Sequence, residues 1–421
     1  MTICAACWHS WMTCRQTTAP PVRFSGMSMP DRAERMDDAG RRLDRVLVWL
    51  QADPAHAGLQ QEAADLCYRL GRFGDARHWL TQQARSAPLS PAARSLDGLL
   101  LLRCGDAAAA IAIFQALLAQ GIATPELHGN LGWALALAGR FDEAGEHALR
   151  AVEGGIAGAG PLHVRILHHQ ARLDEAIRVA EDALAHDPAQ LPHYGILATL
   201  YLDRDEPDTA AAFARKVRAQ APDDADANTV LGVAALLGQR RDEADRFFRH
   251  ALHHQPHSGR ARAGRGLVGM LDGHLETAED HFRLAVADMP AHAGIWHGLA
   301  WCQLLTGRTG QAHASLQAAL ALDRTLADTH GGLAVLAALS GRPDEAGACI
   351  RRALGLDPGC LSALLARGLL LRQSGHAAAA QQQLDGLMNQ PLLPDGTTLQ
   401  QALATHVLST RARHHAAPRR R

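Results

Sequence analysis

The sequence predicts an all-α protein in which short helices pack in pairs along a repeating array. Three observations predict this fold class: the composition, a residue pattern that recurs at fixed spacing, and turn-forming residues between helix-forming segments. Of the 421 residues, 47% are hydrophobic but only 4% are aromatic, so the apolar residues are mainly Ala, Leu and Val. Such a composition favours helices that pack closely on helices. A chain of this length also exceeds what one compact core usually supports, which favours an array.

An alanine recurs through the chain at a nearly constant interval and marks the repeat. It ends three similar stretches, GRFDEA at Ala144, ARLDEA at Ala176 and GRPDEA at Ala346. The interval is 34 residues, with one interval of 32 residues between Ala144 and Ala176. The ten marker alanines are Ala76, Ala110, Ala144, Ala176, Ala210, Ala244, Ala278, Ala312, Ala346 and Ala380. A period in this range is typical of repeats that each contain one helical hairpin.

Small residues at a second position predict that two helices approach closely in each repeat. Twelve residues before the marker, nine of the ten positions hold Ala or Gly, and the exception is Val164. Four residues after the marker, one turn along the same helix face, every repeat has an apolar residue. We expect the small residues to let the backbones approach, and the marker alanine to pack against the partner helix.

Turn and cap residues divide each repeat into two helices. Glycine stands five residues before the marker in seven repeats and can adopt the left-handed conformation that ends a helix: Gly71, Gly105, Gly139, Gly273, Gly307, Gly341 and Gly375. Acidic residues directly before the marker suit the first turn of a second helix, where exposed N–H groups attract carboxylates. Proline stands twelve residues after the marker in six repeats and predicts the end of that helix: Pro88, Pro188, Pro222, Pro256, Pro290 and Pro358.

With these features at this period, the sequence resembles the tetratricopeptide repeat family over ten consecutive units, residues 57–390. The resemblance implies a right-handed α-solenoid, a superhelix of antiparallel helix pairs whose first helices line a concave groove. It also implies a protein or peptide partner. Lys216 is the only lysine, and this bias towards Arg, with abundant Ala, Gly and His, is typical of a GC-rich bacterial gene.

The chain ends and the fourth unit depart from the repeat. Residues 1–38 lack a periodic apolar face and are predicted to be disordered, whereas residues 39–56 are predicted to form an N-terminal capping helix. Residues 391–421 are predicted to form a C-terminal capping helix followed by a basic tail. The fourth unit combines the two-residue deletion with the turn GGIAGAGP, which indicates either a flexible joint or an ordinary shortened turn.

Charge and hydropathy exclude several classes of protein. The chain has 42 basic and 43 acidic residues and a net charge of -1, so no overall field attracts nucleic acid or an anionic membrane. No apolar run reaches the length of a transmembrane helix, and the N-terminus lacks the pattern of a signal peptide. Together with eight scattered cysteines, which suit a reducing compartment, these observations predict a cytoplasmic protein.

The sequence gives little indication of catalysis or of a cofactor. It contains no HExxH, GxSxG, Walker-type or dinucleotide-binding motif, so no catalytic residue is predicted. Its densest histidine cluster consists of His250, His253, His254 and His257, and His250 and His254 would share one helix face. Because no carboxylate stands at ligand spacing, we interpret this cluster as a polar outer face and predict no metal ligand.

The family resemblance implies a set of groove residues, at eleven and eight residues before the marker. Mapped onto this sequence, these positions predict a mainly apolar partner-binding groove in which Arg165 and His168 are polar exceptions. The candidate residues are Leu99, Leu102, Trp133, Arg165, His168, Val233, Leu236, Leu267, Met270, Trp301, Leu304 and Val335. An indole ring buries roughly 200 Å², worth about 5 kcal/mol gross, so an open Trp133 or Trp301 would contribute strongly to binding. Inner-face Leu and Val also pack between neighbouring first helices, so about half of this lining is expected to be core.

These observations predict a non-enzymatic scaffold or adaptor that binds a partner peptide or helix in an apolar concave groove. A family subtype holds a partner's C-terminal carboxylate with lysines and asparagines, and this clamp is absent because Lys216 lies on a second helix. The first alternative is a nucleic-acid-binding helical-repeat protein, which the neutral charge and aliphatic groove disfavour. The second is a metal-dependent enzyme that uses the histidine cluster.

Overall fold

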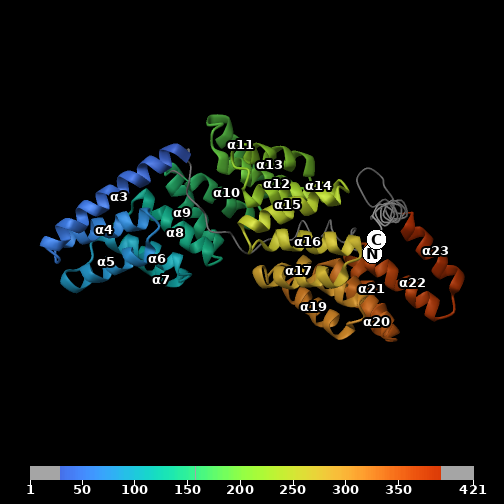
Figure 1. Ribbon diagram of the computed structural model, residues 1–421. Helices are drawn as coiled ribbons and strands as arrows, with labels where there is room; N and C mark the ends of the chain where they lie inside the picture. Colours follow the sequence, from blue (N-terminus) through green and yellow to red (C-terminus); the bar gives the residue numbers. More distant parts are fainter. Residues whose placement is uncertain (1–28, 157, 390–421) are drawn as a thin grey trace, which may run out of the picture. The chain divides into compact units, whose positions relative to one another are not determined.

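The computed structural model describes residues 29–156 and 158–389, which divide into two units. The N-terminal unit comprises residues 29–196 and the C-terminal unit residues 197–389 of the described chain (Figure 1). The described residues form twenty-one α-helices, labelled α3 to α23, and contain no strand. The predicted all-α class is therefore confirmed.

Ten helical hairpins follow the N-terminal helix α3 (Met29–Ala52). Their first helices are α4 (Ala57–Arg69), α6 (Pro91–Arg103), α8 (Pro125–Leu137), α10 (Ala159–His169), α12 (Leu191–Asp203), α14 (Ala225–Leu237), α16 (Gly259–Asp272), α18 (Ala293–Leu305), α20 (Ala327–Leu339) and α22 (Leu361–Gln373). Their second helices are α5 (Phe73–Ser86), α7 (Ala107–Ala119), α9 (Phe141–Glu153), α11 (Leu173–His186), α13 (Pro207–Gln220), α15 (Arg241–His254), α17 (Leu275–Asp288), α19 (Thr309–Leu322), α21 (Pro343–Leu356) and α23 (Ala377–Met388).

The tight turn inside each hairpin requires a left-handed residue five positions before the marker. All seven glycines predicted there have φ between 69° and 83°. The three repeats without glycine keep the same conformation at Ala171 (φ 60°), Asp205 (φ 63°) and Gln239 (φ 58°). Because a Cβ atom makes this region unfavourable, the fold imposes strain at these three positions.

The second helices begin and end where the sequence predicts. Asp142 and Glu143 lie in the first turn of α9, and the Arg140 guanidinium binds Glu143 at 2.6 Å. Equivalent Arg–acid pairs span three residues at the start of α5, α11, α15 and α21. Each of the six predicted prolines stands two residues after the last residue of a second helix.

The marker alanines lie in the core, since each is at most 2% exposed. Ala278 contacts its partner helix as expected, because a Cβ at Gly269 would lie 3.2 Å from its methyl group. The small residue twelve positions before the marker has two roles. At Gly132 it lets the helix backbones approach as expected, because an added Cβ would lie 3.1 Å from the backbone nitrogen of Ala148. At Gly232 and Gly266 an added Cβ would lie 2.6 Å from Phe248 and 2.8 Å from Phe282, which stand four residues after their markers. Glycine is therefore required here to accommodate a ring.

The next repeat accommodates the other side of the same ring. An added Cβ at Gly264 would lie 2.4 Å from Phe248, and one at Gly298 would lie 2.4 Å from Phe282. In the third and fourth repeats the residue four positions after the marker is alanine, Ala148 and Ala180 respectively. The position of the next repeat that is equivalent to Gly264 and Gly298 then holds a large residue. These residues are Leu162 and Ile196, which are 2% and 4% exposed. At these interfaces a large residue on one side is thus matched by a small residue on the other.

The N-terminal helix covers the first hairpin but begins earlier than predicted. Leu43, Val46 and Leu50 are at most 4% exposed and belong to one cluster with the buried residues of α4 and α5. The helix begins at Met29 instead of residue 39, so the expectation of disorder up to residue 38 is wrong for residues 29–38. These residues include good helix formers and an Asp37–Arg41 ion pair one turn apart.

The two-residue deletion in the fourth repeat shortens its first helix. α10 has 11 residues, whereas α8 and α12 have 13 each. Gly155 and Gly158 in the preceding turn are left-handed, with φ of 73° and 87°. The division between the two units falls in α12, one repeat later. The flexible joint stays a prediction, and the predicted C-terminal cap and tail (391–421) lie outside the described residues.

Candidate functional site

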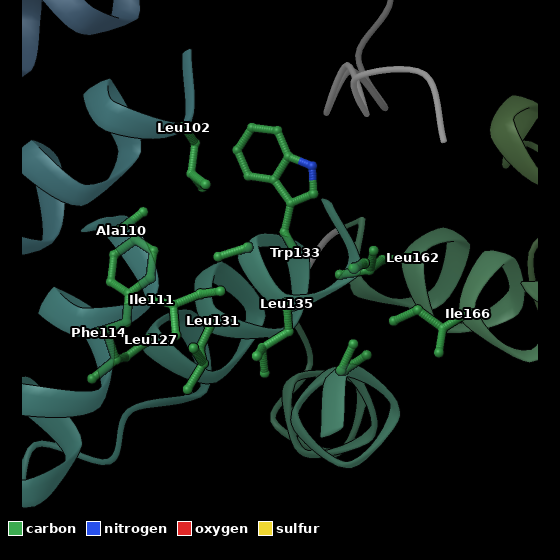
Figure 2. Close-up of a cluster of buried hydrophobic side chains, with 14 of the residues drawn as sticks. Leu102, Ala110, Ile111, Phe114, Leu127, Leu131, Trp133, Leu135, Leu162 and Ile166 are labelled. Atoms are coloured by element: carbon green, nitrogen blue, oxygen red, sulfur yellow. The ribbon is translucent and has the colours of Figure 1, made fainter. Parts of the chain in front are cut away.

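One predicted groove residue, Trp133 on α8, can be followed in Figure 2. Its indole points to the opposite side from Leu131 and Leu135 and lies near Leu102 of α6. Phe114 of the second helix α7 lies below, towards the other side of this cluster. The binding role of these positions stays a prediction.

Most of the predicted groove residues are buried. Eight of the twelve are between 2% and 8% exposed: Leu102, Trp133, Val233, Leu236, Leu267, Met270, Trp301 and Val335. Trp133 is 5% exposed and Trp301 is 6% exposed, so neither ring offers an open surface. Their hydrophobic area is already removed from water, and their replacement would affect stability before it affected binding.

Four predicted groove residues remain partly exposed. Leu99, Arg165 and His168 belong to the N-terminal unit, and Leu304 belongs to the C-terminal unit. Arg165 and His168 lie three residues apart on α10, so they share one face of the shortened helix. Leu99 lies on α6, two repeats earlier. The accessible part of the predicted site is thus mixed in polarity and concentrated in the N-terminal unit.

Polar residues that the sequence analysis missed lie buried in the C-terminal unit. His297 on α18 and Thr329 on α20 are 6% and 0% exposed, and the His297 Nε2 lies 2.6 Å from the Thr329 hydroxyl. Burial lowers the pKa of His297 to about 4. The Glu279 carboxylate, 1% exposed, contacts Arg283 at 2.7 Å and also contacts Arg308. The His297–Thr329 and Glu279–Arg308 contacts join neighbouring repeats, and all three contacts satisfy polar groups whose burial without a partner would destabilise the fold.

The histidine cluster acquires a carboxylate that sequence spacing did not show. Asp223 lies in the turn before α14, and its Oδ1 is 3.2 Å from Nε2 of His250 and 3.4 Å from Nε2 of His254. Within the described chain, this trio forms a group of possible ligand atoms that all lie within 4.8 Å of one another. His253 is on the same helix but outside this trio.

The repeat register could have revealed this contact. Asp223 stands 21 residues before its marker, and His254 stands ten residues after it. In the next repeat the same two positions hold His257 and Asp288, which also lie in contact, with Nδ1 3.3 Å from Oδ1. The turn before a first helix and the end of its second helix therefore meet in both repeats, and a pairing rule at this register predicts which side chains approach.

Helix length and hydropathy bear on membrane insertion. Among the described helices, none combines the length and the apolar character needed to cross a bilayer.

The chain matches the tetratricopeptide repeat family model over residues 62–125, 98–161, 196–245 and 304–359. Solved structures with a similar fold include the APC/C hetero-tetramer Cut9-Hcn1, with 15% identity, a TM-score of 0.50, and coverage of 90% of this chain and 91% of that one. A human IFIT1 dimer with m7Gppp-AAAA has 15% identity and a TM-score of 0.51, with 83% and 93% covered. A search of curated proteins gave no match.

These comparisons agree with the helical-repeat fold of the structure. The matched segments carry seven of the ten marker alanines, and the neighbours at TM-scores of 0.50 and 0.51 are helical-repeat solenoids. The left-handed turn and the buried marker alanine recur in all ten hairpins of the described chain. The chain is therefore a member of the tetratricopeptide repeat family, with ten consecutive repeats.

Proposed function

We propose that this protein is a non-enzymatic interaction scaffold whose N-terminal unit binds a segment of a partner protein along its first helices. Tetratricopeptide repeats generally mediate protein–protein interaction, and the repeat is typically a non-catalytic scaffold. The observation that supports this site most directly is the partial exposure of Leu99, Arg165 and His168 at the groove positions that the family resemblance implies.

The polarity of these residues suggests the chemistry of the partner. Leu99 offers apolar surface, whereas Arg165 offers a cation with donors suited to a carboxylate. Asp65 and Tyr68 on α4 occupy the equivalent positions of the first repeat and are also partly exposed. Burial raises the pKa of Asp65, so this carboxyl gains from a hydrogen-bond donor on a ligand. We therefore expect a peptide with both apolar and charged side chains, in place of the purely apolar ligand that the sequence predicted.

In this proposal the buried groove residues of the C-terminal unit form part of its core. Val233, Leu236, Leu267 and Met270 pack inside the unit and leave Leu304 as the accessible predicted residue there. Cytoplasmic location and bacterial origin stay predictions from the sequence.

Charge reversal on matched faces tests the proposed site. Arg165→Glu changes the proposed binding face of α10, and Arg178→Glu makes the same change on an exposed position of the second helix α11. The purified protein would be used to select a peptide from a displayed random library, and the affinity of that peptide would be measured for both variants. We expect Arg165→Glu and Leu99→Glu to weaken binding at least tenfold and Arg178→Glu to leave it unchanged. Equal affinities in all three variants, with native helicity, would refute the proposed face.

RNA binding is the competing function, because IFIT1 structures of similar fold hold m7Gppp-AAAA or PPP-AAAA. The nearly equal numbers of acidic and basic residues disfavour it. Filter binding of a 5′-triphosphate RNA against salt concentration separates the two functions. Tight binding with a steep salt dependence, lost in Arg165→Glu, would favour RNA over a peptide as the ligand.

A further inference from the structure

Three side chains of the sixth repeat converge on one point of its surface. His250 and His254 stand one turn apart near the end of α15, so their rings share a face, with ring centroids 4.9 Å apart. Asp223 belongs to the turn between α13 and α14, 27 residues before His250 in the sequence. All three belong to the C-terminal unit.

The turn that carries Asp223 is held in place from both sides. The Asn228 side-chain amide donates to the carbonyl of Pro222 at 2.9 Å and to the carbonyl of Asp224 at 2.7 Å. The Asp224 carboxylate accepts from the backbone N–H of Ala227 at 2.7 Å and caps α14. Because Asn228 is fully buried, this turn is fixed by the core, and the backbone of Asp223 is positioned before any ligand arrives.

The distances are compatible with a shared ion, and Oδ1 of Asp223 also lies within hydrogen-bond distance of Nε2 of His250. The Oδ1 to Nε2 separations of 3.2 and 3.4 Å are longer than a strong hydrogen bond between these groups. Ligand atoms at about 2.0–2.1 Å from a tetrahedral Zn²⁺ lie about 3.3–3.4 Å from one another, which matches both separations. The two imidazoles are 40% and 34% exposed, so their rings have room to turn towards a common ion.

We propose that Asp223, His250 and His254 bind one divalent transition-metal ion, with Zn²⁺ as the best fit. Two imidazole nitrogens and one carboxylate oxygen are ligands that zinc accepts, and the two histidines have the i, i+4 spacing of known helical zinc sites. Mg²⁺ and Ca²⁺ prefer oxygen ligands and suit this set poorly. Solvent fills the remaining coordination position, because the site lies on the surface.

The ion would join the two ends of one repeat. It ties the turn before the first helix α14 to the last turn of the second helix α15, and these segments otherwise meet through side chains alone. Binding to the folded form but not to the unfolded chain stabilises the repeat in proportion to the occupancy. His257 is 83% exposed and lies against Asp288 in the equivalent place of the next repeat, but no second histidine completes a trio there.

Metal titration of the full chain, purified without a histidine tag and freed of metal by a chelator, tests the site. Zn²⁺ is titrated by calorimetry, and bound zinc is counted by elemental analysis after dialysis. We expect His250→Ala, His254→Ala and Asp223→Asn each to bind one equivalent fewer than the wild type, or to bind that equivalent at least tenfold more weakly. His253→Ala is the matched control, since it removes a neighbouring imidazole outside the trio, and it should keep the full stoichiometry.

Thermal unfolding gives a second readout that does not depend on counting ions. Saturating Zn²⁺ should raise the unfolding midpoint of the wild type and of His253→Ala, with a smaller rise in the three ligand variants, whereas Mg²⁺ should have no effect. The proposal is overturned if His253→Ala loses as much zinc as His250→Ala, or if the wild type and Asp223→Asn bind zinc equally. Circular dichroism checks that each variant retains its helices.

Discussion

Two regions of the molecule use the same repeat but pack it in two ways. In the sixth and seventh repeats, Phe248 and Phe282 each fill a space between glycines of successive first helices. In the third and fourth repeats, Ala148 and Ala180 take the equivalent position, and the next repeat supplies Leu162 or Ile196. The comparison shows that a small residue on one side of this interface can be offset by a large residue on the other.

The units also differ at their predicted groove positions. The C-terminal unit buries six of its seven predicted residues and leaves Leu304 partly exposed, whereas the N-terminal unit buries Leu102 and Trp133 and leaves Leu99, Arg165 and His168 partly exposed. We therefore interpret this register as core at most positions of the C-terminal unit and as a candidate binding face at three of the five positions in the N-terminal unit.

Among the changes that test this comparison, replacement of Trp301 is expected to change the free energy of unfolding most. Trp301→Ala should lower the free energy of unfolding by about 3–5 kcal/mol, because it leaves a cavity where a ring is 6% exposed. Leu99→Ala, in the other unit, should cost much less because that side chain is only partly buried. Urea unfolding followed by circular dichroism measures both variants. If Trp301→Ala unfolds like the wild type, this position belongs to a binding surface and the contrast between the units is lost.

Exchange of the two packing arrangements tests volume conservation directly. Gly264→Leu should destabilise the C-terminal unit by about 1–3 kcal/mol or more, because its Cβ would lie 2.4 Å from Phe248. Adding Phe248→Ala recreates the arrangement of Ala148 with Leu162 and should recover part of that loss. A double-mutant cycle in urea gives the coupling free energy. Strictly additive effects would show that the two positions do not share one space.

Acid should weaken the C-terminal unit through its buried histidines. Burial lowers the pKa of His297 to about 4, and burial followed by the charge of Arg260 lowers that of His292 to about 4 as well. The unfolded chain takes up these protons near pH 6.5 while the folded chain does not, so stability falls as the pH drops from 6.5 towards 4. For His297 the loss between pH 7 and pH 5 is about 2 kcal/mol.

Urea unfolding midpoints at pH 7 and pH 5 measure this loss. His297→Gln keeps a polar group near the Thr329 hydroxyl but cannot take up a proton, so its midpoint should vary less with pH than that of the wild type. An unchanged pH dependence in this variant would assign the acid sensitivity to other groups.

The smallest predicted effect is a gain in stability at a strained turn. Gln239 has a φ of 58° at a position where seven other repeats have glycine. Gln239→Gly should therefore raise the free energy of unfolding by about 0.5–1 kcal/mol. The reverse change at the equivalent position of the next repeat, Gly273→Gln, should lower it by about 1 kcal/mol. A loss of stability in Gln239→Gly would mean that the side chain contributes more than the backbone strain costs.

The architecture could be predicted from the sequence alone, because each repeat needs only local signals. The left-handed glycine, the acidic first turn and the proline after the helix act within a few residues, and their fixed period places every hairpin. The same register predicted groove positions for Trp133 and Trp301.

The exposure of those side chains and the contacts between distant groups depend on tertiary packing, so the sequence did not predict them. The burial of Trp301 depends on the helices that surround it. A helical period indicates the side of the helix on which a residue lies, but it does not give the distance from that side to the neighbouring helices. Asp223 approaches His250 and His254 because a turn and a helix end converge in space, although 27 residues separate Asp223 from His250. A sequence pattern identifies residues that share a face of one helix. A binding face or a set of metal ligands depends on packing between helices.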